Sequence, residues 1–285
     1  MTQSRLLFTL MAMCILFSAV AFSQLDTPRP SPLGKIEQAV GIMKVTIEYS
    51  RPGVKGRKIF GDLVPYGEVW RTGANAPTLV TFSDDVKVQG NSVPAGQYSL
   101  YTIPGENEWT IILNKKVTGG AQLDEKEDLV RFKAMPKKTL QPVETMTFSV
   151  TNVTNNTAAV ELAWENTMIG FGLEFDVDSR VMAQIDEAMK EPYADVASMY
   201  YQAANYYYTN GKDLKKAQDW VIKSLDLDPE AFFVWRLKAQ IQAGLKDYDG
   251  AIATGKIAIE KAEKADNAQF VKLNKDSIAE WEKMR

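Results

Sequence analysis

The amino-acid sequence predicts a two-domain protein of the β plus α class, in which an antiparallel β-sandwich or barrel precedes a short α-helical stack. Three observations support this prediction. Nine short segments between residues 43 and 175 resemble strands, and turns rich in glycine, proline and asparagine separate them. From residue 179 onward these turns are lost and apolar residues recur at helical spacing. Within this second region a sequence pattern repeats after 34 residues.

The first 23 residues predict a cleavable secretory signal peptide. Arg5 precedes an uncharged run at residues 6–22, and small residues stand three and one before a cut after Ser23. A cut after Ala21 is an alternative. We expect the protein to be exported to the periplasm or the extracellular space, with no stable membrane insertion after cleavage. An uncleaved membrane anchor and a lipid anchor at Cys14 are the competing interpretations, and the apolar residues after Cys14 disfavour the second.

Residues 24–37 hold three prolines within the first nine positions, which predicts a proline-rich linker. Residues 38–178 predict the β-sandwich domain. Its first strand, Met43–Tyr49, alternates apolar and polar side chains with a period of two, as a sheet with one buried face requires. The other expected strands span residues 78–82, 86–88, 98–103, 109–113, 129–134, 145–153, 158–164 and 169–175.

Residues 179–285 predict a helical repeat domain. The sequence KDLKKA at residues 212–217 recurs as KDYDGA at residues 246–251, an offset of 34 residues. This period resembles the tetratricopeptide repeat, which implies paired helices with a large aromatic near the start, a small residue at the helix crossing and a proline at the end. The corresponding residues here are Tyr201 and Trp235, Ala217 and Ala251, and Pro229. Residues 267–283 are expected to form a closing helix.

The composition of the mature chain excludes several classes of protein. Removal of the first 23 residues leaves no cysteine, no histidine, and 32 Lys and Arg against 36 Asp and Glu, a net charge of −4. Catalysis by Ser-His-Asp or Cys-His groups and ordinary zinc sites are therefore excluded. Mild acidity argues against a nucleic-acid partner. We expect no cofactor and no metal, and the composition favours a protein that is not an enzyme.

The densest functional candidate is the cationic segment between the first two expected strands, residues 49–78. It carries five Lys and Arg against two acids, a local charge of +3, together with five glycines. Arginines suit planar anions, and aromatic rings could form a wall beside a ligand. The expected ligand is small and anionic, or a carbohydrate. The candidate ligand-binding residues are Arg51, Lys55, Arg57, Tyr66, Trp70, Arg71, Asn75 and Thr78.

An alternative interpretation of this segment is purely structural. Its arginines would then satisfy backbone carbonyls and acids, and Phe60, Tyr66 and Trp70 would fill the core. The two interpretations differ in whether the side chains converge on an open pocket or are packed away.

Two stretches within this region closely resemble a secreted family known as domain of unknown function 2911. They are RPGVKGRKIFGDLVPYGEVWRTGANAPT, at residues 51–78, and VPAGQYSLYTIPGENEWTIILNK, at residues 93–115. The resemblance covers about residues 32–164. It implies a β-rich exported domain, sometimes followed by tetratricopeptide-like helices, with no established activity.

The function that these observations predict is a non-enzymatic exported binding protein. The β domain would bind the small ligand, and residues 180–285 would contact a protein or peptide partner, with the tyrosines at 200–208 lining a groove or packing between repeats. A first alternative is a carboxylate-dependent hydrolase acting on glycans, because acids are plentiful. A second alternative is a structural module of an envelope assembly.

Overall fold

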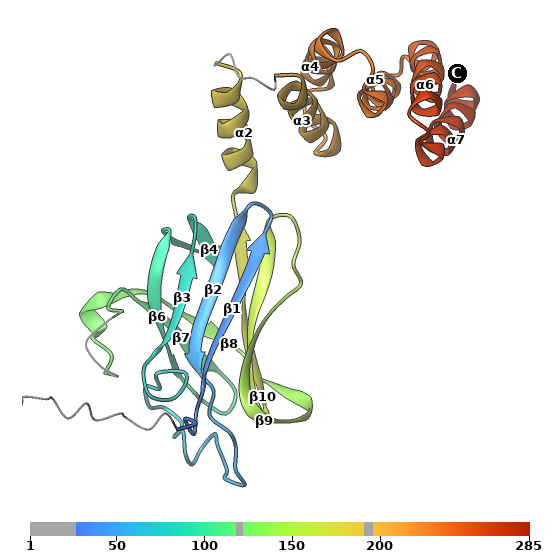
Figure 1. The fold of residues 1–285 in the computed structure, drawn as a ribbon. Helices are drawn as coiled ribbons and strands as arrows, with labels where there is room; N and C mark the ends of the chain where they lie inside the picture. The colour runs from blue at the N-terminus through green and yellow to red at the C-terminus, as the bar shows by residue number, and fades with distance from the viewer. Residues whose placement is uncertain (1–26, 118–121, 191–195) are drawn as a thin grey trace, which may run out of the picture. The chain divides into compact units, whose positions relative to one another are not determined.

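The computed structural model describes residues 27–117, 122–190 and 196–285. The chain divides into two compact units between Val177 and Asp178. The predicted order, a β domain followed by helices, is confirmed (Figure 1). The predicted signal peptide at residues 1–23 lies outside the described residues.

The β domain consists of two antiparallel sheets (Figure 1). One has six strands in the order β1-β2-β3-β6-β7-β8, and the other has four in the order β5-β4-β10-β9. The short 3-10 helix η1 (Glu125–Glu127) precedes β8. The strands are β1 (Leu33–Val40), β2 (Met43–Ser50), β3 (Thr78–Phe82), β4 (Val86–Val88), β5 (Asn91–Val93), β6 (Gly96–Ile103), β7 (Trp109–Asn114), β8 (Asp128–Ala134), β9 (Lys137–Thr151) and β10 (Thr157–Phe175).

One hydrophobic core joins the two sheets. The predicted alternation in β2 is observed, since Val45, Ile47 and Tyr49 are buried while the residues between them are more exposed. The ring of Tyr49 meets Phe148 of β9 edge to face, with ring centroids 4.8 Å apart. The hydroxyl oxygen of Tyr49 also accepts a hydrogen bond from the backbone N–H of Phe148 at 3.0 Å. These contacts connect the sheets, because the two residues belong to different ones.

The first strand begins inside the segment that the sequence predicts to be a linker. β1 starts at Leu33 and pairs with β2 over its whole length, from Leu33 opposite Ser50 to Val40 opposite Met43. The linker prediction, residues 24–37, is therefore too long at its C-terminal end. β1 is an edge strand with charged residues on its open face, so its apolar period is weak.

β10 contains both of the strands predicted at residues 158–164 and 169–175. Its pairing with β9 shifts register at Glu165, which has a left-handed φ of 55°. Beyond this bend the strand turns back on itself. A hydrogen bond of 2.8 Å from the N–H of Phe175 to the carbonyl of Asn156 shows that its two ends lie side by side. The bend therefore lies at one end of the domain, and Asn156 and Phe175 lie at the other.

The described residues after β10 form six helices. They are α2 (Val177–Ala188), α3 (Val196–Thr209), α4 (Leu214–Leu227), α5 (Phe232–Gly244), α6 (Tyr248–Lys264) and α7 (Ala268–Met284). α4 and α6 start 34 residues apart, and an aspartate caps each. Asp213 accepts from the N–H of Lys215 at 2.9 Å, and Asp247 accepts from the N–H of Gly250 at 2.9 Å. None of the helices in the described segments is both long and apolar enough to span a bilayer.

Small buried residues allow these helices to pack closely. Ala217 on α4 and Ala251 on α6, which the 34-residue offset relates, are completely buried. On the next helix along, Ile278 and Trp281 of α7 fill the space beside Gly255. The 34-residue offset in the sequence therefore relates two helices at equivalent positions and two alanines that are equally buried.

Candidate functional site

The cationic segment is a long connection between β2 and β3 that backbone hydrogen bonds fix at both ends. Near its start, the N–H of Val54 donates to the carbonyl of Glu144 at 2.8 Å, and the carbonyl of Pro52 accepts from Met146 at 2.9 Å. Near its end, Trp70 and Thr102 exchange backbone hydrogen bonds of 2.7 and 2.9 Å. The segment is therefore attached to β9 and to β6, and its exposed side chains project from a supported backbone.

Trp70 faces inward. It stands in a cluster of aromatic rings with Phe60, Trp109 and Trp164, whose centroids lie 5.9, 6.4 and 5.9 Å from its own. Its indole N–H donates to the carbonyl of Gly73 at 3.1 Å. The structure thus places Trp70 at the margin of the core, with its hydrogen-bonding group already satisfied.

Three more predicted ligand-binding residues are engaged internally. Arg51 donates from Nε to the carbonyl of Met146 at 3.2 Å and from Nη2 to the hydroxyl of Thr147 at 2.9 Å. Thr78 is buried, and its hydroxyl donates to the carbonyl of Thr72 at 2.6 Å. Asn75 has a left-handed φ of 62° and donates to the hydroxyl of Ser50 at 3.2 Å. Through these contacts the three side chains hold the segment against the sheets.

Lys55, Arg57 and their neighbour Lys58 are exposed. Arg57 donates to the carbonyls of Val54 and Gly53, at 3.0 and 2.6 Å, which fixes its guanidinium over the turn. Within the described ranges, none of these three cations lies within ion-pair distance of a carboxylate. The three cations therefore stand together on one turn, and none of their charged groups forms an ion pair within the described ranges. Lys58 belongs to the segment but was not among the predicted contact residues.

Arg71 is half-buried, and its Nε is buried with no hydrogen-bond partner among the described residues. A buried guanidinium nitrogen without an acceptor is costly, so an arriving acceptor would be favoured there.

Tyr66 is 40% exposed, and its ring lies against Gly61. A Cβ atom at position 61 would come within 2.6 Å of this ring. Gly61 also has a φ of 83°, which favours glycine.

A backbone donor also shapes the turn. The N–H of Lys55, whose φ is 51°, donates to the Oε1 atom of Glu144 at 2.9 Å. The carboxylate therefore fixes the turn on which the three cations stand. The sequence alone does not indicate this role, because Glu144 is 89 residues away along the chain.

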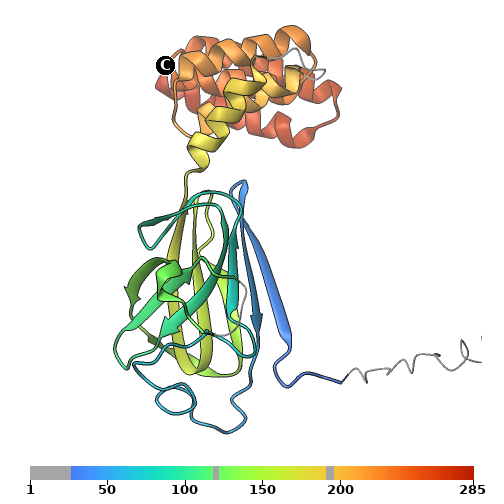
Figure 2. The same ribbon diagram turned by 90° about the vertical axis from the view of Figure 1, so that its left-hand side faces the viewer.

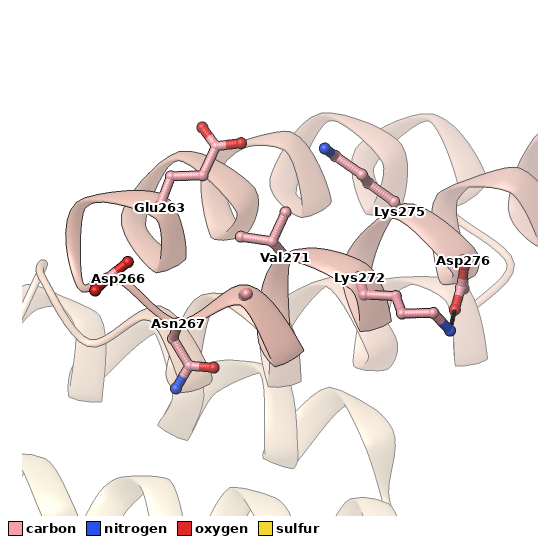
Figure 3. Close-up of a pocket in the computed structure, with 8 residues that line it drawn as sticks. Glu263, Asp266, Asn267, Val271, Lys272, Lys275 and Asp276 are labelled. Atoms are coloured by element: carbon pink, nitrogen blue, oxygen red, sulfur yellow. Dashed lines mark hydrogen bonds and ion pairs between the residues drawn. The ribbon is translucent and has the colours of Figure 1, made fainter.

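Described residues of the helical unit line two hollows. The first, about 240 Å³, lies between α3, α4 and α5, where Tyr201 and Phe233 meet edge to face at 4.9 Å. The second, about 420 Å³, lies along α6 and α7, with Val271 at its centre and charged groups around it (Figure 3). Lys272 and Asp276 pair at 3.1 Å on its rim. The first hollow is lined in part by the rings of Tyr201 and Phe233, which can pack against an apolar side chain.

The tyrosine run of α3 mostly packs between helices. Tyr207 is buried, and its ring meets Trp220 of α4 edge to face at 4.8 Å. The hydroxyl of Tyr206 donates to Asp178 at 2.9 Å. On α5, burial lowers the pKa of Arg236, whose Nη1 donates to the Oδ1 atom of Asn274 on α7 at 3.0 Å. Tyr201, beside the first hollow, is the member of the run best placed to meet a partner.

The comparisons with known proteins concern mainly the β domain. A family model described as a protein of unknown function, DUF2911, matches residues 31–173. No curated protein matches the chain. The solution structure of a protein from Bordetella parapertussis is 17% identical, with a TM-score of 0.32, over 37% of this chain and 87% of that one. The family match includes both stretches that carry the resemblance noted in the sequence and extends over half of the chain, so the chain belongs to the DUF2911 family of proteins of unknown function.

Proposed function

We propose that this protein is an exported binding protein whose β domain captures anionic groups with the turn at residues 55–58. The observation that carries the proposal is the set of three exposed cations, Lys55, Arg57 and Lys58, whose charged groups form no ion pair with a described carboxylate. Several exposed lysines elsewhere on the domain are ion-paired, such as Lys35 with Glu48 and Lys44 with Glu37, both at 3.1 Å. Concentrated positive charge on a fixed turn attracts phosphate, sulfate or carboxylate groups, including those of acidic carbohydrates.

The helical unit is the proposed binding surface for a protein partner. We infer that it is a tetratricopeptide-like stack, since α4 and α6 repeat at the 34-residue offset with the same type of cap and the same buried alanine. The hollow beside Tyr201 and Phe233 would accept an apolar side chain of a bound peptide.

The anion-binding proposal is tested by thermal unfolding with a sulfated heparin hexasaccharide, inorganic phosphate and uncharged maltohexaose as probes. The hexasaccharide should raise the unfolding temperature, and maltohexaose should not, because a ligand that binds only the folded state stabilises it. The double variant Lys55→Gln/Lys58→Gln should lose the shift.

The matched control removes two lysines elsewhere on the same domain. Lys35→Gln/Lys44→Gln takes away the same charge from β1 and β2, where both lysines are ion-paired at 3.1 Å. This variant should respond to the hexasaccharide as the unmodified protein does. An equal loss in both variants would mean that only the overall charge matters, and the turn would not be a site.

A further inference from the structure

Exposed apolar side chains gather at one end of the β domain. We call this end the loop end; it comprises residues 51–77, 104–108, 133–144 and 164–168, with the start of β1 (Figures 1 and 2). Six of the eight large hydrophobic side chains that the described β domain exposes lie there. They are Leu33, Leu63, Tyr66, Val69, Met135 and Leu140. The other two, Ile42 and Val153, lie in turns at the opposite end.

Strand pairing places these residues together. Leu33 lies opposite Ser50, where β2 ends and the cationic segment begins. Met135 directly follows Ala134, which pairs with Trp109 at the start of β7. Leu140 lies between the residues of β9 that pair with Thr167 and Glu165, at the bend of β10. Chain segments that are far apart in sequence thus contribute apolar side chains to a single end.

The same end has a net positive charge, whereas the rest of the domain has a net negative one. It holds eight Lys and Arg against six Asp and Glu, a net charge of +2, whereas the rest of residues 27–177 holds eight against eleven, a net charge of −3. Lys137 and Lys138, at the start of β9, are exposed and have no ion-pair partner among the described residues. With the turn at residues 55–58 they give five exposed cations that make no ion pair with a described carboxylate.

The apolar side chains protrude. Leu140 is fully exposed and Met135 is 76% exposed, on either side of the two lysines. Apolar side chains that project singly from a turn or from the end of a strand, with lysines beside them, suit the interface of a bilayer, where apolar groups enter the acyl region and cations meet lipid phosphates. The aliphatic stems of Lys137 and Lys138 can follow Leu140 into the interface while their ammonium groups stay at the phosphates.

We propose that the loop end of the β domain docks on the surface of an anionic lipid bilayer, with Met135 and Leu140 entering the interface and Lys137 and Lys138 contacting lipid phosphates. The inference rests on the proposed function, because Lys55, Arg57 and Lys58 would contribute to the same contact. It adds the bilayer as the source of the anion. Binding of this kind is peripheral and reversible, and it weakens as salt screens the charges.

The test uses protein purified from cells that export and process it, with its N-terminus determined by mass spectrometry. Co-sedimentation is measured with vesicles of phosphatidylcholine alone and of phosphatidylcholine with an equal part of phosphatidylglycerol. The protein should bind the anionic vesicles and not the neutral ones. Met135→Ser/Leu140→Ser should lower the partition coefficient about tenfold. Lys137→Gln/Lys138→Gln should also lower it and reduce its salt dependence.

The control variant Ile42→Ser/Val153→Ser removes two exposed apolar side chains from the opposite end and should bind as before. Soluble glycerol phosphate and the sulfated hexasaccharide are tested in parallel. Binding of these soluble anions without binding of anionic vesicles would overturn the docking proposal and leave the proposed function standing. Absence of binding to any of them would overturn both. Vesicle binding that Met135→Ser/Leu140→Ser does not reduce would also contradict insertion at this end.

Discussion

The indole rings of Trp70 and Trp164 stack with their centroids 5.9 Å apart and their planes 20° from parallel. Trp70 lies near the end of the cationic segment and Trp164 belongs to β10, so the stack joins the segment to the four-stranded sheet. Phe60, earlier in the segment, meets the same Trp164 edge to face at 6.1 Å. The connection between β2 and β3 is thus part of the core along one side, and its cations are held on the other.

Trp70→Ala should destabilise the β domain by about 3 to 5 kcal/mol, since it removes a large ring from an aromatic cluster and leaves a cavity. Tyr66→Ala, which truncates an exposed ring on the same segment, should cost about 1 kcal/mol. Chemical denaturation followed by tryptophan fluorescence measures both. Equal, small effects would show that Trp70 is not a core residue.

Ala251→Leu should destabilise the helical unit by about 1 to 3 kcal/mol, because no space is free at a completely buried position where helices cross. Ala253→Leu, on the exposed side of the same helix, should leave the unfolding free energy within about 0.5 kcal/mol of the original. Circular dichroism at 222 nm follows the helical transition of each variant in urea. A neutral Ala251→Leu would mean that α6 does not pack as the structure shows.

The ion pair of Asp178 with Lys212, 2.7 Å long, should make the stability of the helical unit depend on pH. Hydrogen bonds from Lys212 and Tyr206 hold the pKa of Asp178 below its ordinary value. A carboxyl with a lowered folded pKa adds stability above its unfolded pKa, and the contribution is lost as the pH falls through the folded pKa.

Asp178→Asn should therefore lower the unfolding free energy near pH 7 and have little effect below about pH 3. The difference at pH 7 should be under about 1 kcal/mol, because the carboxylate is half exposed and solvent screens the pair. Urea unfolding of both proteins from pH 7 to pH 3 measures it. A difference that grows on acidification has the wrong sign and would refute the assignment.

Glu144→Ala should speed hydrogen exchange at the amide of Lys55 about fivefold, because it removes the side-chain acceptor of that N–H. The amide of Val54 provides an internal control, since it donates to the backbone carbonyl of residue 144, which the substitution leaves in place. Glu144→Gln keeps an acceptor oxygen and should preserve protection at Lys55. Uniform acceleration at both amides would show that the whole turn has been released.

The sequence predicts the fold class because period-two alternation and the 34-residue period are both strong signals. The strands at Thr78–Phe82 and Val86–Val88 have the predicted bounds. β1 escaped prediction because three prolines precede it and its exposed face is charged, which makes an edge strand resemble a linker. β5 spans three residues and has too few positions to show a period.

The candidate site could be predicted only in part. The composition of the segment shows its positive charge. Because charged side chains are mostly exposed, the outward direction of Lys55 and Arg57 could be expected. The inward direction of Trp70 and the internal hydrogen bonds of Arg51 depend on β9 and β10, nearly 100 residues away along the chain. Lys137 and Lys138 lie at the cationic end through pairings between distant segments, such as Gly53 with Thr145 and Thr167 with Lys138, which no local pattern encodes.

A two-dimensional NMR titration of the protein with the sulfated hexasaccharide tests the central claim most directly. We predict that backbone amide shifts change mainly at residues 54–58, saturate with ligand and diminish at high salt. Amides of the opposite end, such as Ile42, should not move. Shift changes confined to other surfaces, or none at ligand concentrations that saturate ordinary anion sites, would contradict the assignment of this turn as the anion-binding site.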